Sequence, residues 1–199
     1  EIGVRLVGSE MCIRDRHYFL GDGTFSTDRM CKYVRPCALG LAEGEVRKNL
    51  LKNIVRLNRE RNYRIGTGFL STPFVLGLLT EAGTPQDAYH MLTNPEFGWM
   101  QQIKKGATTV WENWTDDASL NHYSKGACCQ WLFDCVCGIR LDERENHFII
   151  EPHPVFQLEN AGFVYESVYG IVESEWKKQG DDYVYHIVIP CNCMAEVKL

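Results

Sequence analysis

The sequence predicts a multi-domain α + β fold, with helices in roughly the first two thirds of the chain and antiparallel strands in the remainder. An apolar period of 3.6 residues runs through residues 43–62, as in an amphipathic helix. A period of two runs through residues 172–189, as in the half-buried strands of a hairpin. The chain has 199 residues, a length that permits one large domain or two modest ones. Hydrophobic residues make up 45% of it, which is enough to build a core.

The first helical signals follow residue 28. We expect Asp28 to cap a helix that ends near Ala42, with Pro36 as a kink or break inside it. The clearest helix covers residues 43–62, because lysine and arginine occupy one of its faces and apolar residues the other. Its apolar face consists of Val46, Leu50, Ile54 and Leu57.

Three further helices are predicted before the strands begin. Pro73 and Pro85 each follow a serine or threonine, which is the favoured arrangement at a helix start, and the first of these helices ends at Gly83. Residues 123–138 are apolar on nearly every side. That composition predicts a helix buried deep inside a helical assembly.

Strand signals dominate from about residue 147 onward. Val172, Ser174 and Trp176 alternate with charged residues, and a Gly-Asp pair separates them from a second alternating run at 183–189. We therefore expect an antiparallel β domain in the form of one sheet or part of a sandwich. The predicted division is a helical domain at 17–143 and a β domain at 144–199.

The first sixteen residues do not fit this scheme. They include the stretch "VGSEMCIRDR", which has no clear period and is similar to translated adaptor sequence at the ends of gene fragments. We expect residues 1–16 to be foreign to the fold and the native chain to begin further upstream. On this view the sequence says nothing about secretion.

Composition argues against several classes of partner. The net charge is −5 and no lysine or arginine run is present, which disfavours nucleic acid or an anionic membrane as the main partner. Nine cysteines occur without a C-x-x-C pair or histidines at ligand spacing, so we expect neither a metal nor another cofactor. Small buried thiols are typical of a reducing compartment such as the cytoplasm. A redox or zinc element is the alternative.

The stretch "GATTVWENW" contains the candidate functional residue Glu112, placed between Trp111 and Trp114. Aromatic faces stack on sugar rings, and the nearby Asn121-His122-Tyr123 could supply hydrogen bonds to hydroxyl groups. A carboxylate in such a site can activate water for glycoside cleavage. The alternative is that both tryptophans are core anchors and that Glu112 pairs with an arginine.

Four stretches, in this order, closely resemble the C-terminal half of bacterial α-L-rhamnosidases of glycoside hydrolase family 78. They are "GTGFLSTP", "GATTVWENW", "NHYSKGA" and "YESVYGIVESEW", and the resemblance covers roughly residues 20–199. It implies the last helices of an (α/α)6 six-hairpin barrel followed by a β-sandwich, an inverting mechanism and a rhamnose-containing carbohydrate as substrate. It also implies that Glu112 is the general base and that His122, Trp111 and Trp114 bind the sugar.

Two departures from the family pattern affect the interpretation. The family usually has arginine where Asn113 stands, which alters the charge near Glu112. The family's general acid lies well upstream, and the acidic segment with Asp22 and Asp28 does not match its motif. We therefore expect this chain to be inactive alone. The alternative function is a carbohydrate-binding module without turnover, and Trp99 could wall the sugar site or close a helix end.

Overall fold

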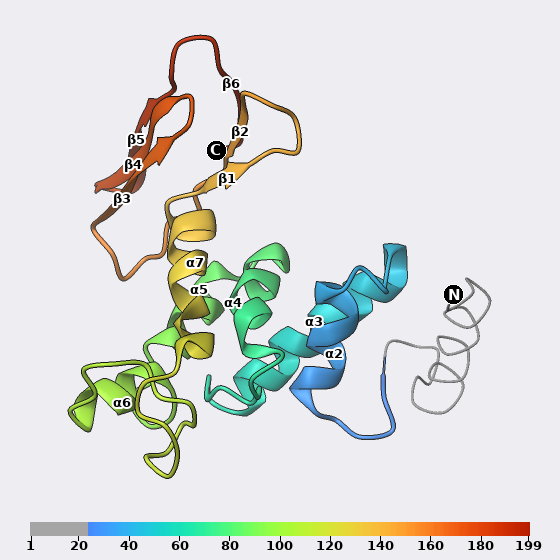
Figure 1. Cartoon of the computed structure of the whole chain (residues 1–199). Coiled ribbons are helices and arrows are strands. Elements are labelled where there is room, and N and C mark those ends of the chain that lie inside the picture. The colour runs from blue at the N-terminus through green and yellow to red at the C-terminus, as the bar shows by residue number, and fades with distance from the viewer. Residues whose placement is uncertain (1–23) are drawn as a thin grey trace, which may run out of the picture.

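The computed structural model describes residues 24–199 and confirms the predicted fold class, a helical part followed by two small β-sheets (Figure 1). The expectation for residues 1–16 lies outside the described residues. The helices are α2 (Met30–Ala38), α3 (Gly44–Glu60), α4 (Thr72–Glu81), α5 (Pro85–Leu92), α6 (Trp99–Lys104) and α7 (Cys128–Trp131). The strands are β1 (Ile139–Leu141), β2 (His147–Ile150), β3 (Asn160–Ser167), β4 (Gly170–Gln179), β5 (Asp182–Val188) and β6 (Met194–Val197).

Helix α3 follows the predicted amphipathic pattern, with one exception. Leu50, Ile54 and Leu57 are buried, whereas Val46 is 38% exposed. Val46 lies in the first turn of the helix, where the apolar stripe extends past the buried cluster. The predicted apolar face is therefore buried at its last three members and not at Val46.

Helix α2 is shorter than the sequence predicted, and Asp28 does not cap it. Arg29 occupies the N-cap position without a side-chain capping bond. The carboxylate of Asp28 instead accepts hydrogen bonds from the Tyr33 hydroxyl at 2.7 Å and from Arg56 of α3 at 2.8 Å. Pro36 lies inside the helix, which ends two residues later, before Gly40 turns the chain at a φ of +63°.

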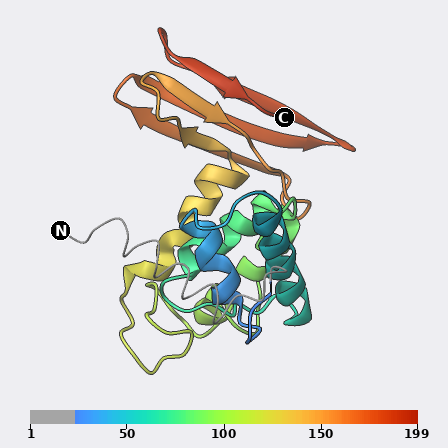
Figure 2. The ribbon, with the colours of Figure 1, turned by 90° about the vertical axis from the view of Figure 1, so that its right-hand side faces the viewer.

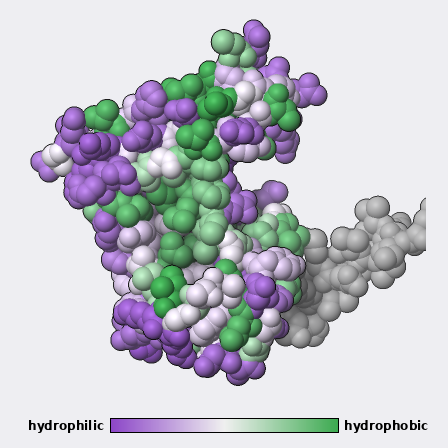
Figure 3. Space-filling model, turned by 60° about the vertical axis from the view of Figure 1, so that its left-hand side comes forward, coloured by the Kyte–Doolittle hydropathy of each residue, from purple (hydrophilic) through white to green (hydrophobic). Residues whose placement is uncertain are grey.

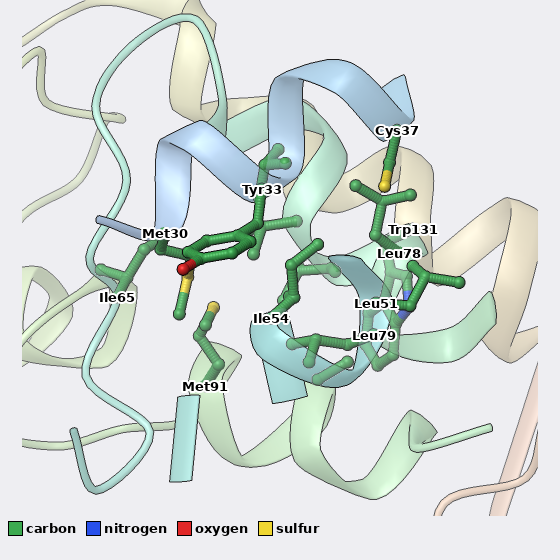
Figure 4. Close-up of a cluster of buried hydrophobic side chains, with 14 of the residues drawn as sticks. Met30, Tyr33, Cys37, Leu51, Ile54, Ile65, Leu78, Leu79, Met91 and Trp131 are labelled. Carbon is green, nitrogen blue, oxygen red and sulfur yellow. The ribbon is translucent and has the colours of Figure 1, made fainter. Parts of the chain in front are cut away.

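The core of the helical part is formed where α2, α3, α4 and α5 meet (Figure 4). Met30, Tyr33, Ile54, Leu79 and Met91 are each at most 1% exposed. Burial of such side chains is the main stabilising contribution to a fold of this size. Helices α4 and α5 begin as predicted after Ser71 and Thr84.

The apolar segment at 123–138 is only partly a regular α-helix. A 3₁₀ turn (Tyr123–Ala127) precedes α7, and a π-helical turn (Leu132–Val136) follows it. Trp131 is a core residue, and its indole N–H donates to the Thr80 hydroxyl at 2.8 Å. Cys129 is exposed and Phe133 is 40% exposed, so the prediction of burial on nearly every side was wrong.

The strands form two three-stranded sheets, with orders β1-β2-β6 and β3-β4-β5. The second sheet is antiparallel throughout, and the predicted hairpin between β4 and β5 turns at Gly180 and Asp181. In the first sheet, β2 and β6 run parallel, so the prediction of an antiparallel β domain was wrong for this one pair. Figure 2 shows the two sheets stacked at one end of the helical part.

The two sheets pack together through a small apolar cluster of their own. Ile139, Phe148 and Ile150 of the first sheet and Val172 of the second are at most 5% exposed. Val172, Ser174 and Trp176 are buried as their alternation predicted. On the face shown in Figure 3, apolar side chains form a band between the sheets and the lower part of the helical region.

Candidate active site

Glu112 and His122 lie on one irregular loop, residues 107–122, that connects α6 to the 3₁₀ turn. Two backbone hydrogen bonds pair the two limbs of this loop. The amide of Glu112 donates to the carbonyl of Ser119 at 2.9 Å, and the amide of His122 donates to the carbonyl of Val110 at 2.7 Å. This pairing places Glu112 and His122 on the two neighbouring limbs of the loop, although ten positions separate them in the sequence.

Glu112 is partly buried as a residue, and its Oε2 accepts an exposed hydrogen bond from the Ser119 amide at 3.3 Å. Within residues 24–199 it forms no ion pair with an arginine, contrary to the alternative considered above. The carboxylate is therefore open to water, the molecule that a general base in a glycosidase activates.

The two tryptophans beside Glu112 have different environments. Trp111 is 6% exposed, whereas Trp114 is only partly buried. The indole N–H of Trp114 donates to the carbonyl of Thr67 at 3.3 Å, which joins the "GTGFLSTP" segment to the loop. The Trp114 ring also meets Trp99 edge to face, with 5.0 Å between ring centres. Trp114 therefore has a fixed ring that reaches the surface.

His122 lies among aromatic rings and has an unpaired nitrogen. Its ring is 5.4 Å from Phe69 and stacks on Tyr123 at 5.5 Å, measured between ring centres. The Nε2 atom is buried and has no hydrogen-bond partner among the described residues. Buried polar atoms are usually paired, so this nitrogen is well suited to bind a hydroxyl group of a ligand.

Lys125 is a further residue of this region that the sequence interpretation missed. Its side chain is buried, with Nζ 4.0 Å from the centre of the Trp114 ring. Burial lowers the pKa of Lys125 to about 8, while the negative charges of Glu112 and Asp117 act in the opposite direction. The available signal was a single lysine within the otherwise apolar stretch "YSKGACCQWLF".

Trp99 begins α6 and packs against the loop. Its indole N–H donates to the carbonyl of Lys125 at 2.8 Å. Gln102, one turn further along α6, donates to the carbonyl of Asn113 at 2.7 Å. Helix α6 thus fixes the loop near Asn113 and the following 3₁₀ turn at Lys125.

Asn113, the position at which the resemblance departs from its family, is exposed. Its side chain donates to Asp117 at 3.2 Å, and the Thr115 hydroxyl donates to the same carboxylate at 2.6 Å. These hydrogen bonds, the Thr115 bond first, lower the pKa of Asp117. The tip of the loop is therefore an ordered acidic turn.

The other residues singled out in the sequence form no second candidate site within the described part of the chain. Asp22 lies outside the described residues, and Asp28 is held by Tyr33 and Arg56. Across residues 24–199, no group of three histidine, cysteine or acidic side chains has the arrangement of a metal site. In the same range, no helix has the length and apolar character needed to cross a membrane.

Comparison with known proteins identifies relatives of both parts of the chain. The six-hairpin glycosidase domain of bacterial alpha-L-rhamnosidases matches residues 12–136, and their C-terminal domain matches residues 146–199. The chain is 30% identical over 195 residues to an alpha-L-rhamnosidase of Streptomyces avermitilis, covering 90% of this chain and 19% of that protein. It is 29% identical over 186 residues to one of Formosa agariphila, covering 87% of this chain and 20% of that protein.

Solved structures share the fold. The crystal structure of the Streptomyces avermitilis alpha-L-rhamnosidase complexed with L-rhamnose has a TM-score of 0.87 at 28% identity, over 97% of this chain and 20% of that chain. The alpha-L-rhamnosidase from Aspergillus terreus has a TM-score of 0.85 at 23% identity, over 98% of this chain and 26% of that chain, which shows the fold alone. The chain thus spans about a fifth of the length of the curated relatives that it matches.

Proposed function

This chain belongs to the bacterial alpha-L-rhamnosidase family, and from that premise we propose that it is part of an enzyme that hydrolyses terminal α-L-rhamnose from glycosides or polysaccharides. The proposal assigns one catalytic role to this chain. Glu112 acts as the general base, which takes a proton from the attacking water.

The proposed mechanism is inverting. A carboxylic acid protonates the leaving oxygen while Glu112 activates water on the opposite face of the sugar, and the two carboxyl groups lie about 6.5–9.5 Å apart to leave room for that water. We propose that the acid is contributed by the part of the enzyme that this chain does not span. Trp114 would contact the sugar and His122 would bind one of its hydroxyl groups through Nε2, whereas Trp111, at 6% exposure, presents no open ring face to a sugar.

The observation that carries the proposal is the environment of Glu112. Its carboxylate accepts a hydrogen bond from one backbone amide, and backbone hydrogen bonds pair the two limbs of the loop that carries it. A general base needs a defined position with respect to the attacking water. The paired loop and the Ser119 amide give the Glu112 carboxylate such a position.

A binding role without turnover is the second candidate for the chain by itself. The observation in its favour is the buried, unpaired Nε2 of His122 beside the aromatic rings of Phe69 and Tyr123. In that case the chain binds L-rhamnose but does not cleave a rhamnoside. The two candidate functions differ in whether a rhamnoside is hydrolysed, but both require binding of L-rhamnose.

A chimera tests the proposal. Residues 24–199 replace the corresponding segment of the Streptomyces avermitilis relative, whose structure superimposes with a TM-score of 0.87. Hydrolysis of an aryl α-L-rhamnoside is measured for the chimera, its Glu112→Gln variant and a Glu145→Gln control at an exposed position. We expect the Glu112 variant to lose roughly 10²–10⁴-fold in kcat, as is typical for loss of a positioned base. The chain alone should show no hydrolysis. An active chimera whose rate is unchanged by Glu112→Gln would refute the assignment.

A further inference from the structure

Helix α6 carries two buried side chains to which the proposed mechanism assigns no role. Trp99 is 7% exposed and Gln102 is 3% exposed, so neither offers a surface on which a sugar could lie. The two positions are three residues apart, which places both side chains on the same face of one helical turn. Any contribution that they make to a sugar site therefore acts through other residues.

Trp99 connects two segments that carry residues of the site. Its indole N–H donates to the carbonyl of Lys125 at 2.8 Å, in the 3₁₀ turn that begins directly after His122. Its ring meets the Trp114 ring edge to face, with 5.0 Å between ring centres and 79° between the ring planes. The Nζ atom of Lys125 lies 4.0 Å from the centre of the same Trp114 ring, which closes this cluster of three side chains. Trp99 thus contacts the His122 segment through its N–H group and the Trp114 segment through its ring.

Gln102 binds the Trp114 segment at the main chain. Its side-chain amide donates to the carbonyl of Asn113 at 2.7 Å, and Asn113 directly precedes Trp114. The indole N–H of Trp114 in turn donates to the carbonyl of Thr67 at 3.3 Å. The backbone before Trp114 and the N–H group of its ring are therefore both held. Because a tryptophan side chain has only two rotatable bonds, these contacts leave the ring little freedom to move.

We propose that Trp99 and Gln102 are positioning residues of the sugar site: they set the position of the Trp114 ring relative to the imidazole of His122. This role rests on the proposed function, in which Trp114 contacts the sugar and His122 binds one of its hydroxyl groups. A ring contact and a hydrogen bond serve one sugar only when the distance between them suits it. Fixing that distance before the sugar arrives lowers the cost of binding.

Fluorine NMR measures the environment of the Trp114 ring without any ligand. The 199-residue chain is labelled with 5-fluorotryptophan, and the Trp114 signal is the one that is lost in Trp114→Phe. Gln102→Met keeps a side chain of similar length but removes the donor to Asn113, and it places no new ring beside Trp114. Gln86→Met is the matched control, because the amide of Gln86 on α5 donates to the carbonyl of Pro154 at 3.1 Å. We expect the Trp114 signal to move only in Gln102→Met. An unmoved signal in that variant, or an equal shift in Gln86→Met, overturns the proposal.

Binding of L-rhamnose to the chain gives the second readout. Trp99→Phe keeps an aromatic ring but removes the donor to the 3₁₀ turn. Trp131→Phe removes a comparable donor, the 2.8 Å bond to the Thr80 hydroxyl that joins α7 to α4. Both variants should lose stability, but only Trp99→Phe should bind L-rhamnose more weakly, by about 5-fold or more in Kd. Equal losses of affinity in the two variants, or an unchanged affinity in Trp99→Phe, overturn the positioning role.

The two readouts separate the positioning role from the proposed function. If the unsubstituted chain does not bind L-rhamnose, that result counts against the proposed function, and the fluorine signal still decides whether α6 fixes the Trp114 ring. If Trp99→Phe does not fold, as circular dichroism would show, Gln102→Met replaces it in the binding measurement. The affinity of Gln102→Met then supports or overturns the role on the same terms.

Discussion

The indole N–H of Trp176 donates a hydrogen bond of 2.7 Å to the main-chain carbonyl of Val136. This bond joins strand β4 to the last turn of the helical part, forty positions earlier in the chain. The Ser174 hydroxyl makes a parallel contact with the carbonyl of Cys137 at 2.6 Å. Both donors are buried, and the carbonyls that they bind belong to the π-helical turn and the residue after it. The β-sheets are thus anchored on backbone groups that the helix end leaves free.

Replacing Trp176 with phenylalanine should destabilise the chain. The change leaves the Val136 carbonyl buried without its donor and removes part of a fully buried ring, which together cost about 2–4 kcal/mol. Chemical denaturation followed by circular dichroism measures the difference. Val184→Ala, on the outward face of β5, is the matched control and should change stability by less than about 0.5 kcal/mol. Equal effects of the two changes would show that the Trp176 contact does not anchor the sheets.

Gly138 should tolerate no side chain. It connects the π-helical turn to β1 at a φ of +77°, and a Cβ atom there would lie 2.2 Å from the backbone nitrogen of Pro152. Gly138→Ala combines a left-handed conformation with a clash against backbone, so we expect a loss of at least about 2 kcal/mol. Gly180→Ala is the control, because its φ is also positive at +66° but the space around it is open. A smaller loss for Gly138→Ala than for Gly180→Ala would contradict the predicted clash.

His122→Ala should weaken binding of L-rhamnose to the 199-residue chain. Removal of the ring deletes the unpaired Nε2 that would bind a sugar hydroxyl, and loss of one such hydrogen bond costs about 1–3 kcal/mol, or roughly 5- to 150-fold in Kd. Chemical shift changes during titration with L-rhamnose report the affinity. His186→Ala, at an exposed position of β5, should leave the affinity unchanged. Retained affinity in the His122 variant would remove this residue from the binding site.

The cysteines should differ in their reaction with iodoacetamide at pH 8. The thiolate is the reactive form, and burial raises the pKa of Cys128 to about 12 and that of Cys137 to about 11. At pH 8 both thiols are therefore almost entirely protonated, and Cys137 is buried as well. Peptide mass spectrometry should find early labelling at the exposed Cys129 and Cys191. Labelling of Cys137 as fast as Cys191 would show that the junction between helices and sheets opens readily.

The periodic elements of this protein could be predicted from the sequence alone. The 3.6-residue period located α3, and the period of two located the hairpin of β4 and β5 with Val172, Ser174 and Trp176 inward. Such patterns are local, because one buried face of a single helix or strand imposes its own repeat on the sequence. The resemblance of four short stretches was sufficient for the family.

Only the tertiary structure decided which distant segments meet. The sequence assigned Asp28 to a helix cap, but Tyr33 and Arg56 form the bonds that hold it. It gave no sign that β6 would pair in parallel with β2, because the same alternation of side chains suits either strand direction. It also gave Lys125 no role, since the burial of a lysine depends on Trp99 and Trp114 approaching it from other parts of the chain. Residue order determines the repeat within an element, whereas desolvation and pairing depend on neighbours that only the packed fold brings together.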